Sequence, residues 1–237
     1  MKRTLIITGG SAGIGAATAR VFLSGGWEVL SLARRPCLEP GARSVVVDLA
    51  AEGWERVVER EALPLVGPGV LCLVHNAATH ENDDALSLPT ERLRAILEVN
   101  IIAPAALNRL FSPLMRPGSS ILYVGSTLSE KAVRQTASYV TSKHALVGLM
   151  RATCQDAAGR GIHTACVCPG FVDTELLRSH ARRGGGDGDA VMKVLAAMSG
   201  HGRLIEAEEI GELLRSCAEQ PVIDGAVLHA NLGQRES

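Results

Sequence analysis

The feature that most constrains the fold is a regular alternation of short apolar runs with longer amphipathic segments. The apolar runs are rich in Val, Ile and Leu, and they end in glycine or polar residues, as at Gly9-Gly10 and His75-Asn76. Strands that are apolar on both faces are typical of a parallel sheet that helices cover on both sides. The alternation therefore predicts an α/β fold with a doubly wound parallel sheet.

This pattern predicts seven strands and four long helices. Pro104 lies inside the second helix and is expected to kink it. The glycine-rich stretch 182–189 is expected to be a mobile loop. A length of 237 residues suits one undivided domain, 1–237. The expected strands are 5–8, 29–32, 45–47, 70–74, 121–124, 164–167 and 226–229, and the expected helices are 12–24, 90–111, 138–158 and 206–219.

Composition and charge exclude several function classes. The formal net charge is -1 at pH 7, so nothing favours binding to nucleic acid or to an anionic membrane. No run of about 18 apolar residues is present, and a membrane-spanning helix is not expected. Aromatic residues make up only 3%, so the core must be built from Val, Leu, Ile and Ala.

The six cysteines show no CxxC pair and no disulfide-like spacing, which predicts reduced thiols in a cytoplasmic protein. Cys166 and Cys168 are expected to lie on one face of a strand. Because no matching His or Cys pair accompanies them, a metal site is not expected there.

A glycine-rich turn joins the first strand to the first helix, where residues 8–15 read TGGSAGIG. Glycines let the backbone turn sharply and approach a pyrophosphate closely, and the N-terminus of the next helix offers free N–H groups to that anion. An ordinary tight turn is the alternative, but the position of the motif favours a dinucleotide site. The expected binding residues are Gly9, Ser11, Gly13, Ile14 and Gly15.

The end of the second strand indicates which dinucleotide is bound. An acidic residue at this point binds the ribose 2′-hydroxyl of NAD. Ala33 stands there instead, and Arg34 and Arg35 follow, so a guanidinium fork can grip the 2′-phosphate of NADP. The alternative is a solvated charge pair in a surface loop. Asp48, at the end of the third strand, is expected either to hold the adenine edge or to cap a helix.

Tyr139 and Lys143 are four residues apart on a predicted helix and therefore lie on one face of it. An ammonium beside a phenol favours the phenolate, which suits the pair to acid/base chemistry. Ser126 follows a strand and can reach the same crevice, where its hydroxyl can hydrogen-bond a substrate oxygen. An ordinary turn residue is the alternative for Ser126.

Taken together, these motifs resemble the short-chain dehydrogenase/reductase family. The resemblance implies a single Rossmann-type domain with a seven-stranded parallel sheet and a substrate loop at about 171–202. It also implies an NADP(H)-dependent oxidoreductase that moves a hydride between the cofactor and a carbonyl or alcohol, as a carbonyl reductase does. The matching residues run in the family's order from Lys2 to about Leu232 and include residues 8–15, Asn76-Ala77-Ala78, Asn100, Ser126, Tyr139, Lys143, Pro169-Gly170 and Thr174.

The resemblance further implies a role for each site residue. Tyr139 would be the general acid in reduction and the base in oxidation, and Lys143 would hold the nicotinamide ribose. Ser126 would orient the carbonyl, and Asn100 would hold a water in a proton relay to Lys143. The remaining residues expected at the cofactor are Asn76, Pro169, Gly170, Val172 and Thr174, with Thr174 on the nicotinamide carboxamide.

The chain departs from the family pattern at two places. The usual Asn-Asn-Ala-Gly after the fourth strand reads His75-Asn76-Ala77-Ala78, so a Cβ must be tolerated near the cofactor. The usual Asp-Gly-Gly near the C-terminus reads Asn231-Leu232-Gly233, which bears on a tetramer contact but not on the chemistry. A homo-oligomer, either dimer or tetramer, is expected through the two long helices.

The expected partner is a small carbonyl or alcohol substrate. The segment 171–202 carries Arg178, His180, Arg182 and Arg183, and one hypothesis is that these basic residues favour an anionic or carrier-bound substrate such as an acyl thioester. A solvated, flexible lid is the other interpretation. The main alternative to an enzyme is a binding protein that senses NADP(H) without turnover, although a sensor has no use for an acid/base pair.

Overall fold

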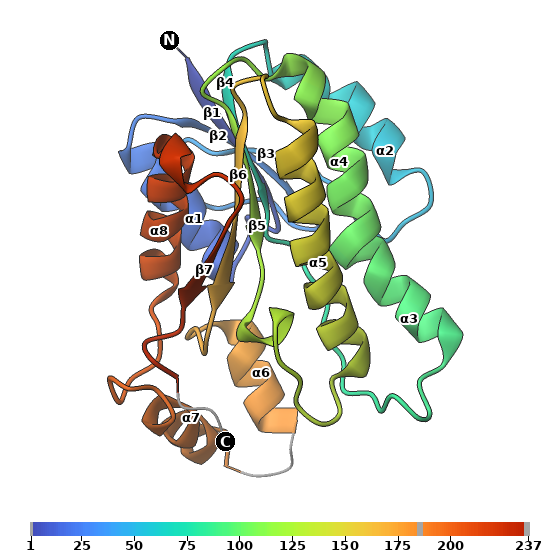
Figure 1. The fold of residues 1–237 in the computed structure, drawn as a ribbon, viewed down its shortest axis with the longest axis vertical. Helices are drawn as coiled ribbons and strands as arrows, with labels where there is room; N and C mark the ends of the chain where they lie inside the picture. The colour runs from blue at the N-terminus through green and yellow to red at the C-terminus, as the bar shows by residue number, and fades with distance from the viewer. Residues whose placement is uncertain (1, 184–186, 235–237) are drawn as a thin grey trace.

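The computed structural model describes residues 2–183 and 187–234. In this part of the chain seven parallel strands form one sheet, and helices cover both of its faces, as Figure 1 shows. The strand order is β3-β2-β1-β4-β5-β6-β7, which confirms the expected doubly wound α/β fold. The strands are β1 (Arg3–Thr8), β2 (Glu28–Ala33), β3 (Arg43–Val46), β4 (Val70–His75), β5 (Ser120–Val124), β6 (His163–Pro169) and β7 (Ala226–Ala230).

The helices form a layer on each side of the sheet. Helices α1 and α8 cover one face, and α2, α4 and α5 cover the other (Figure 1). The helices are α1 (Gly13–Ser24), α2 (Trp54–Val57), α3 (Thr90–Leu97), α4 (Ala103–Phe111), α5 (Ala137–Asp156), α6 (Glu175–Arg183), α7 (Gly188–Ala197) and α8 (Ala207–Glu219), and the shorter 3-10 and π turns are η1 (Val58–Ala62), η2 (Leu63–Leu65), η3 (Glu98–Ile102), η4 (Ser112–Leu114), η5 (Thr127–Ser129) and η6 (Pro221–Ile223).

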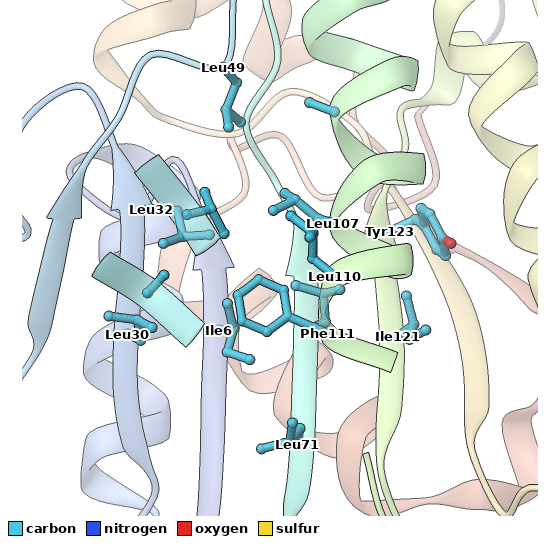
Figure 2. Packing of buried hydrophobic residues seen from close by; sticks show 14 of the residues in the cluster. Ile6, Leu30, Leu32, Leu49, Leu71, Leu107, Leu110, Phe111, Ile121 and Tyr123 are labelled. Atoms are coloured by element: carbon cyan, nitrogen blue, oxygen red, sulfur yellow. The ribbon is translucent and has the colours of Figure 1, made fainter. Parts of the chain in front are cut away.

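Strand β1 shows why two separate cores form. Ile6 belongs to a cluster that includes Leu107 and Phe111 of α4, whereas Leu5 and Ile7 belong to the cluster on the α1 and α8 side. Figure 2 shows the Phe111 ring beside Ile6, between α4 and the sheet. Because side chains alternate along a strand and both faces are covered, the strand is apolar throughout.

The helix expected at 90–111 forms and contains a π turn. Helix α3 ends at Leu97, the π turn η3 follows, and α4 begins at Ala103, within one helical run from Thr90 to Leu114. Pro104 comes directly after the π turn, and its ring lacks the N–H that would continue the regular helical hydrogen bonds. The irregularity in this helix therefore includes a π turn directly before Pro104.

The segment 171–202 is more ordered than a simple loop. It contains α6 and α7, and both extend into the glycine-rich stretch 182–189 that the sequence predicts as a mobile loop. Residues 184–186 of that stretch lie outside the described part of the chain. The substrate-loop position thus holds two helices beside the sheet edge.

Within residues 2–183 and 187–234, one helical run is long and apolar enough, by length and composition alone, to cross a membrane. The run Thr90–Leu114 has a mean hydropathy of 1.2 over its most apolar window. In the structure Leu107, Leu110 and Phe111 of this run belong to the core against the sheet. A helix that packs in a core passes the same test, so the run is weak evidence for a span.

A buried polar network ties α4 and α5 to the sheet. His75 Nε2 lies 2.8 Å from Asn108 Oδ1, and Asn108 Nδ2 donates to Tyr123 OH at 2.7 Å. Tyr123 OH in turn lies 2.9 Å from Thr153 Oγ1. Because the Asn108 amide donates to Tyr123, its Oδ1 accepts, and His75 carries its proton on Nε2. Burial lowers the pKa of His75 to about 4, against the opposing effect of its hydrogen bond to Asn108.

Acidification is expected to destabilise the protein through His75. Between its unperturbed pKa of 6.5 and the lowered pKa of about 4, the histidine binds a proton in the unfolded chain but not in the folded protein. The free energy of unfolding therefore falls as the pH drops through this window. In urea titrations at pH 7 and pH 4.5, the wild type should lose about 2 kcal/mol more stability than a His75→Asn variant. Equal losses in the two proteins would contradict a buried neutral histidine.

Candidate active site

A cleft opens at the carboxyl edge of the sheet. Its volume is about 770 Å³, and residues that follow β1, β2, β4, β5 and β6 line it. Strands β1 and β4 are neighbours in the sheet although they are not consecutive in the chain, which creates a switch in strand order. Open parallel sheets bind ligands outside the strand ends at such a switch. Helices α6 and α7 lie beside this edge (Figure 1).

The glycine turn between β1 and α1 shapes one end of the cleft. Gly9 and Gly13 have φ angles of +70° and +54°, a conformation that residues with a Cβ rarely adopt. A Cβ at Gly15 would lie 2.2 Å from Gly9 O, so only glycine lets α1 pass so close to the turn. Gly9, Ser11, Gly13 and Ile14 line the cleft, whereas Gly15 is buried and packs the helix against the turn.

The N-terminus of α1 is open to an anion. Helix α1 begins at Gly13 after Ala12, no side chain in the described residues caps it, and its first turn carries no acidic residue. The first N–H groups of a helix have no intrahelical partner, and the helix dipole favours a negative charge beside them. The glycine turn and this helix end together fit the pyrophosphate of a dinucleotide.

Asn76 connects the glycine turn to the end of β4. Its Nδ2 donates to Thr8 O at 2.9 Å and to Gly9 O at 3.3 Å. Thr8 Oγ1 accepts from the backbone N–H groups of Asn76 and Ala77 at 3.0 and 2.9 Å. Asn76 also lines the cleft, so it holds the turn in shape from the cofactor side.

The residues that follow β2 and β3 lie at the same end of the cleft. Arg34 and Arg35 are exposed, line the cleft and form no ion pair with any described residue, so both guanidinium groups can meet a phosphate. Asp48 lines the cleft as well, and its Oδ1 accepts from Ala50 N at 3.0 Å. Because α2 starts only at Trp54, Asp48 closes a turn and does not cap a helix.

Tyr139, Lys143 and Ser126 meet in the middle of the cleft. Lys143 is buried, its Nζ donates to Val124 O at 2.7 Å, and the same Nζ lies 5.4 Å from the centre of the Tyr139 ring. Ser126 follows β5 directly, and its Oγ accepts from Leu128 N at 3.1 Å, which leaves the hydroxyl hydrogen for another acceptor. The arrangement brings a phenol, an ammonium and a hydroxyl to one surface.

Ser126 rests on a buried cluster of small side chains. Its N–H donates to Ser129 Oγ at 3.1 Å. A Cβ at Gly125 would lie 2.7 Å from Cys168 Sγ and 2.8 Å from Cys166 Sγ, so the chain can pass the two thiols only with glycine there. The sulfurs are 3.8 Å apart on one face of β6, and a hydrogen bond from Cys166 lowers the pKa of Cys168. This cluster sets the height of Ser126 above the sheet.

Asn100 lies in the π turn η3 and is buried. Its Oδ1 accepts from Thr79 N at 2.9 Å, and its Nδ2 donates to Thr79 O at 3.0 Å and to Ser142 Oγ at 2.9 Å. Ser142 Oγ donates to Tyr139 O at 2.7 Å. Asn100 thus joins the loop after β4 to the helix that carries Tyr139 and Lys143. A water relay from Asn100 to Lys143 stays a prediction.

Two further residues of this loop contact the start of α5, and the sequence analysis missed both. The His80 ring packs edge to face with the Tyr139 ring, with 4.6 Å between centroids and an interplanar angle of 83°. Asp83 is buried, accepts from Ser138 N at 3.0 Å and hydrogen-bonds the Ser138 hydroxyl. The available signal was the polar run at 79–84 directly after a strand end, since such runs gather at the cleft.

The end of β6 and the residues after it line the cleft next to the glycine turn. Pro169, Gly170, Val172 and Thr174 all line it, and a Cβ at Gly13 would lie 3.3 Å from Thr174 Cγ2. Thr174 therefore lies beside the glycine turn at Gly13.

Two of the basic residues expected near the substrate form ion pairs with carboxylates of the same segment. Arg178 forms two hydrogen bonds to the Asp173 carboxylate, at 2.7 and 2.6 Å, and Arg182 is paired with Glu175. Neither arginine lines the cleft. The side chains of His180 and Arg183 lie outside what the structure describes. The ion pairs favour a helix-stabilising role for Arg178 and Arg182 over binding of an anionic substrate.

The sequence of this chain is similar to those of several known proteins. The family model described as short chain dehydrogenase matches residues 3–183. A cyclic-di-GMP-binding biofilm dispersal mediator protein of Escherichia coli is 34% identical over 182 residues, which cover 73% of this chain and 74% of that one. Carbonyl reductase family member 4 of Xenopus tropicalis is 26% identical over 237 residues, which cover 96% of each chain.

The solved structures show the same fold. A putative NAD(P) dependent gluconate 5-dehydrogenase from Beutenbergia cavernae, determined with bound NADP, superposes with a TM-score of 0.83 at 28% identity, over 98% of this chain and 96% of that one. The family match spans most of the chain, including the glycine turn and the residues around Ser126, Tyr139 and Lys143. This chain belongs to the short-chain dehydrogenase family.

Proposed function

We propose that this protein is an NADP(H)-dependent oxidoreductase that transfers a hydride between the nicotinamide and a carbonyl or alcohol carbon, acting as a carbonyl reductase. The observation that carries the proposal is the placement of Lys143 Nζ 5.4 Å from the Tyr139 ring centre in the same cleft as Ser126 and the glycine turn. Membership in an oxidoreductase family supports the reaction class.

In this proposal Tyr139 donates a proton to the carbonyl oxygen during reduction and accepts it during oxidation. The Ser126 hydroxyl hydrogen-bonds the same oxygen and stabilises the charge that develops on it. The Lys143 ammonium, 5.4 Å from the centre of the Tyr139 ring, binds the nicotinamide ribose. The bound NADP(H) supplies or accepts the hydride. Thr174, beside the glycine turn, holds the nicotinamide carboxamide.

The cofactor preference rests on the residues after β2. Ala33 offers no carboxylate to a ribose 2′-hydroxyl, and Arg34 and Arg35 line the cleft without an ion-pair partner among residues 2–183 and 187–234. A guanidinium group binds a phosphate through two parallel hydrogen bonds. Arg34 is the residue that we assign to the 2′-phosphate of NADP(H), with Arg35 beside it and Asp48 at the adenine edge.

The proposal also includes a cytoplasmic, homo-oligomeric enzyme. All six cysteines are free thiols, which fits a reducing compartment. Ile102, between α3 and α4, is 49% exposed, which fits a contact between copies through the long helices. The competing function is an NADP(H)-sensing protein without turnover. The Escherichia coli relative is named as a binding protein, with cyclic-di-GMP as its ligand. The tyrosine and lysine pair favours the enzyme.

Removing the phenol oxygen of Tyr139 is expected to abolish turnover and leave cofactor binding intact. In a Tyr139→Phe variant, kcat for NADPH-dependent carbonyl reduction should fall about 10²- to 10⁴-fold, because the general acid is lost. The Kd for NADPH, from fluorescence titration, should stay within about twofold. The phenylalanine ring can keep the edge-to-face contact with His80, so the midpoint of thermal unfolding should stay unchanged and serves as the control for an intact fold. Full activity of Tyr139→Phe would favour the sensing protein.

Removing the Arg34 side chain is expected to erase the preference for NADPH. Loss of charge-assisted hydrogen bonds to the 2′-phosphate should weaken NADPH binding about 10- to 100-fold in Arg34→Ala. Binding of NADH, which lacks this phosphate, should change less than about threefold. Titration of both cofactors against both proteins makes the comparison. Wild-type protein that binds NADH as tightly as NADPH would refute the assignment of Arg34.

A further inference from the structure

Beyond the glycine turn and the residues after β2 and β3, the cleft has a set of apolar lining residues. These residues come from the segment after β5, from the β6–α6 segment and from the end of α7. We call this region the substrate chamber and define it by its apolar residues, Leu128, Val133, Phe171, Leu176, Leu177 and Met198.

Two walls of the substrate chamber present apolar side chains to water. Val133 is 52% exposed and Leu176 is 55% exposed, and they come from segments more than 40 residues apart in the chain. Apolar surface gains free energy when it leaves water, so these side chains favour an apolar ligand between them. The described residues leave about half of each of these two residues uncovered.

Polar side chains also line the cleft beside the substrate chamber, and some of them already have partners. The Thr136 hydroxyl donates to Val133 O at 2.8 Å, and Glu175 is paired with Arg182. The His80 ring is packed against Tyr139. Hydroxyl groups of a polyhydroxylated substrate that lie against the leucine and valine side chains would be buried without hydrogen bonds, which is unfavourable.

We infer, on the basis of the proposed oxidoreductase function, that the substrate is an apolar ketone or aldehyde, with aliphatic or aromatic groups on the carbonyl carbon. In reduction the carbonyl carbon accepts the hydride from NADPH and the carbonyl oxygen accepts the proton of Tyr139. A C–H and an O–H bond form, the π bond of the carbonyl breaks, and the products are the alcohol and NADP⁺. The substrate chamber holds the apolar groups while Tyr139 and Ser126 meet the oxygen.

A matched pair of ring ketones tests this inference. Cyclohexanone and myo-inosose share one six-membered ring and one carbonyl, and they differ in the five hydroxyl groups of the inosose. The expected kcat/KM of the wild type with NADPH is at least about 100-fold higher for cyclohexanone, and it should rise along the series 2-butanone, 2-hexanone and 2-octanone. Equal or better turnover of the inosose would overturn the apolar substrate class while hydride transfer stands.

A variant of the chamber wall gives an independent readout. Leu176→Asn keeps the size of the side chain but places an amide in the wall, and it should lower kcat/KM for 2-octanone about tenfold through KM. The Kd for NADPH should stay unchanged. The matched control is Leu86→Asn, at a leucine that is 98% exposed and outside the cleft, which should retain wild-type kinetics.

The outcomes separate the two proposals. An unchanged kcat/KM for 2-octanone in Leu176→Asn would overturn the apolar chamber. If the wild-type protein binds NADPH but reduces no ketone, both the proposed function and this inference are refuted.

Discussion

The candidate site depends on the hydrogen bonds between Thr8 and Asn76, which join the ends of β1 and β4. These strands are paired from Arg3↔Val70 to Ile7↔Val74, and Thr8 Oγ1 then accepts from the two N–H groups that follow β4. A slip of one residue would turn every side chain to the other face of the sheet. The contact at the strand ends therefore aligns the glycine turn with the loop after β4, and the cleft lies between them.

The fold could be predicted from the sequence to the extent that burial imposes a pattern. The five inner strands, β1, β2, β4, β5 and β6, are buried on both faces, so an apolar run ending in glycine or polar residues is sufficient to find them. The π turn η3 has no such pattern, because one extra residue in a helical turn leaves the apolar spacing nearly unchanged. Helices α6 and α7 flank a run of glycines, and local composition there favours a loop over the helices that tertiary contacts support.

A site residue could be predicted from the sequence where a reactive side chain stands at a strand end or shares a helix face with another one. Ser126 follows a strand, and Tyr139 and Lys143 share a helix face, so sequence spacing alone brings the residues to the cleft that contains them in the structure. His80 and Asp83 reach the same helix from an irregular loop, whose path is set by the contacts of Asn100 with Thr79. A loop whose path depends on tertiary hydrogen bonds has no regular spacing of apolar residues in its sequence. The sequence analysis missed His80 and Asp83 for that reason.

Polar contacts at two levels fix the helix that carries Tyr139 and Lys143. Close to the cleft, Asn100 donates to Ser142, one turn after Tyr139. Deeper in the core, Asn108 and Tyr123 surround Thr153, near the far end of α5. Apolar packing is not directional and tolerates a small slide of a helix along the sheet, whereas each buried polar group loses its partner if the helix moves. Because both sets of hydrogen bonds are satisfied only in one position, the phenol and the ammonium are held at a constant height above the sheet, as the proposed proton transfer to a bound carbonyl requires.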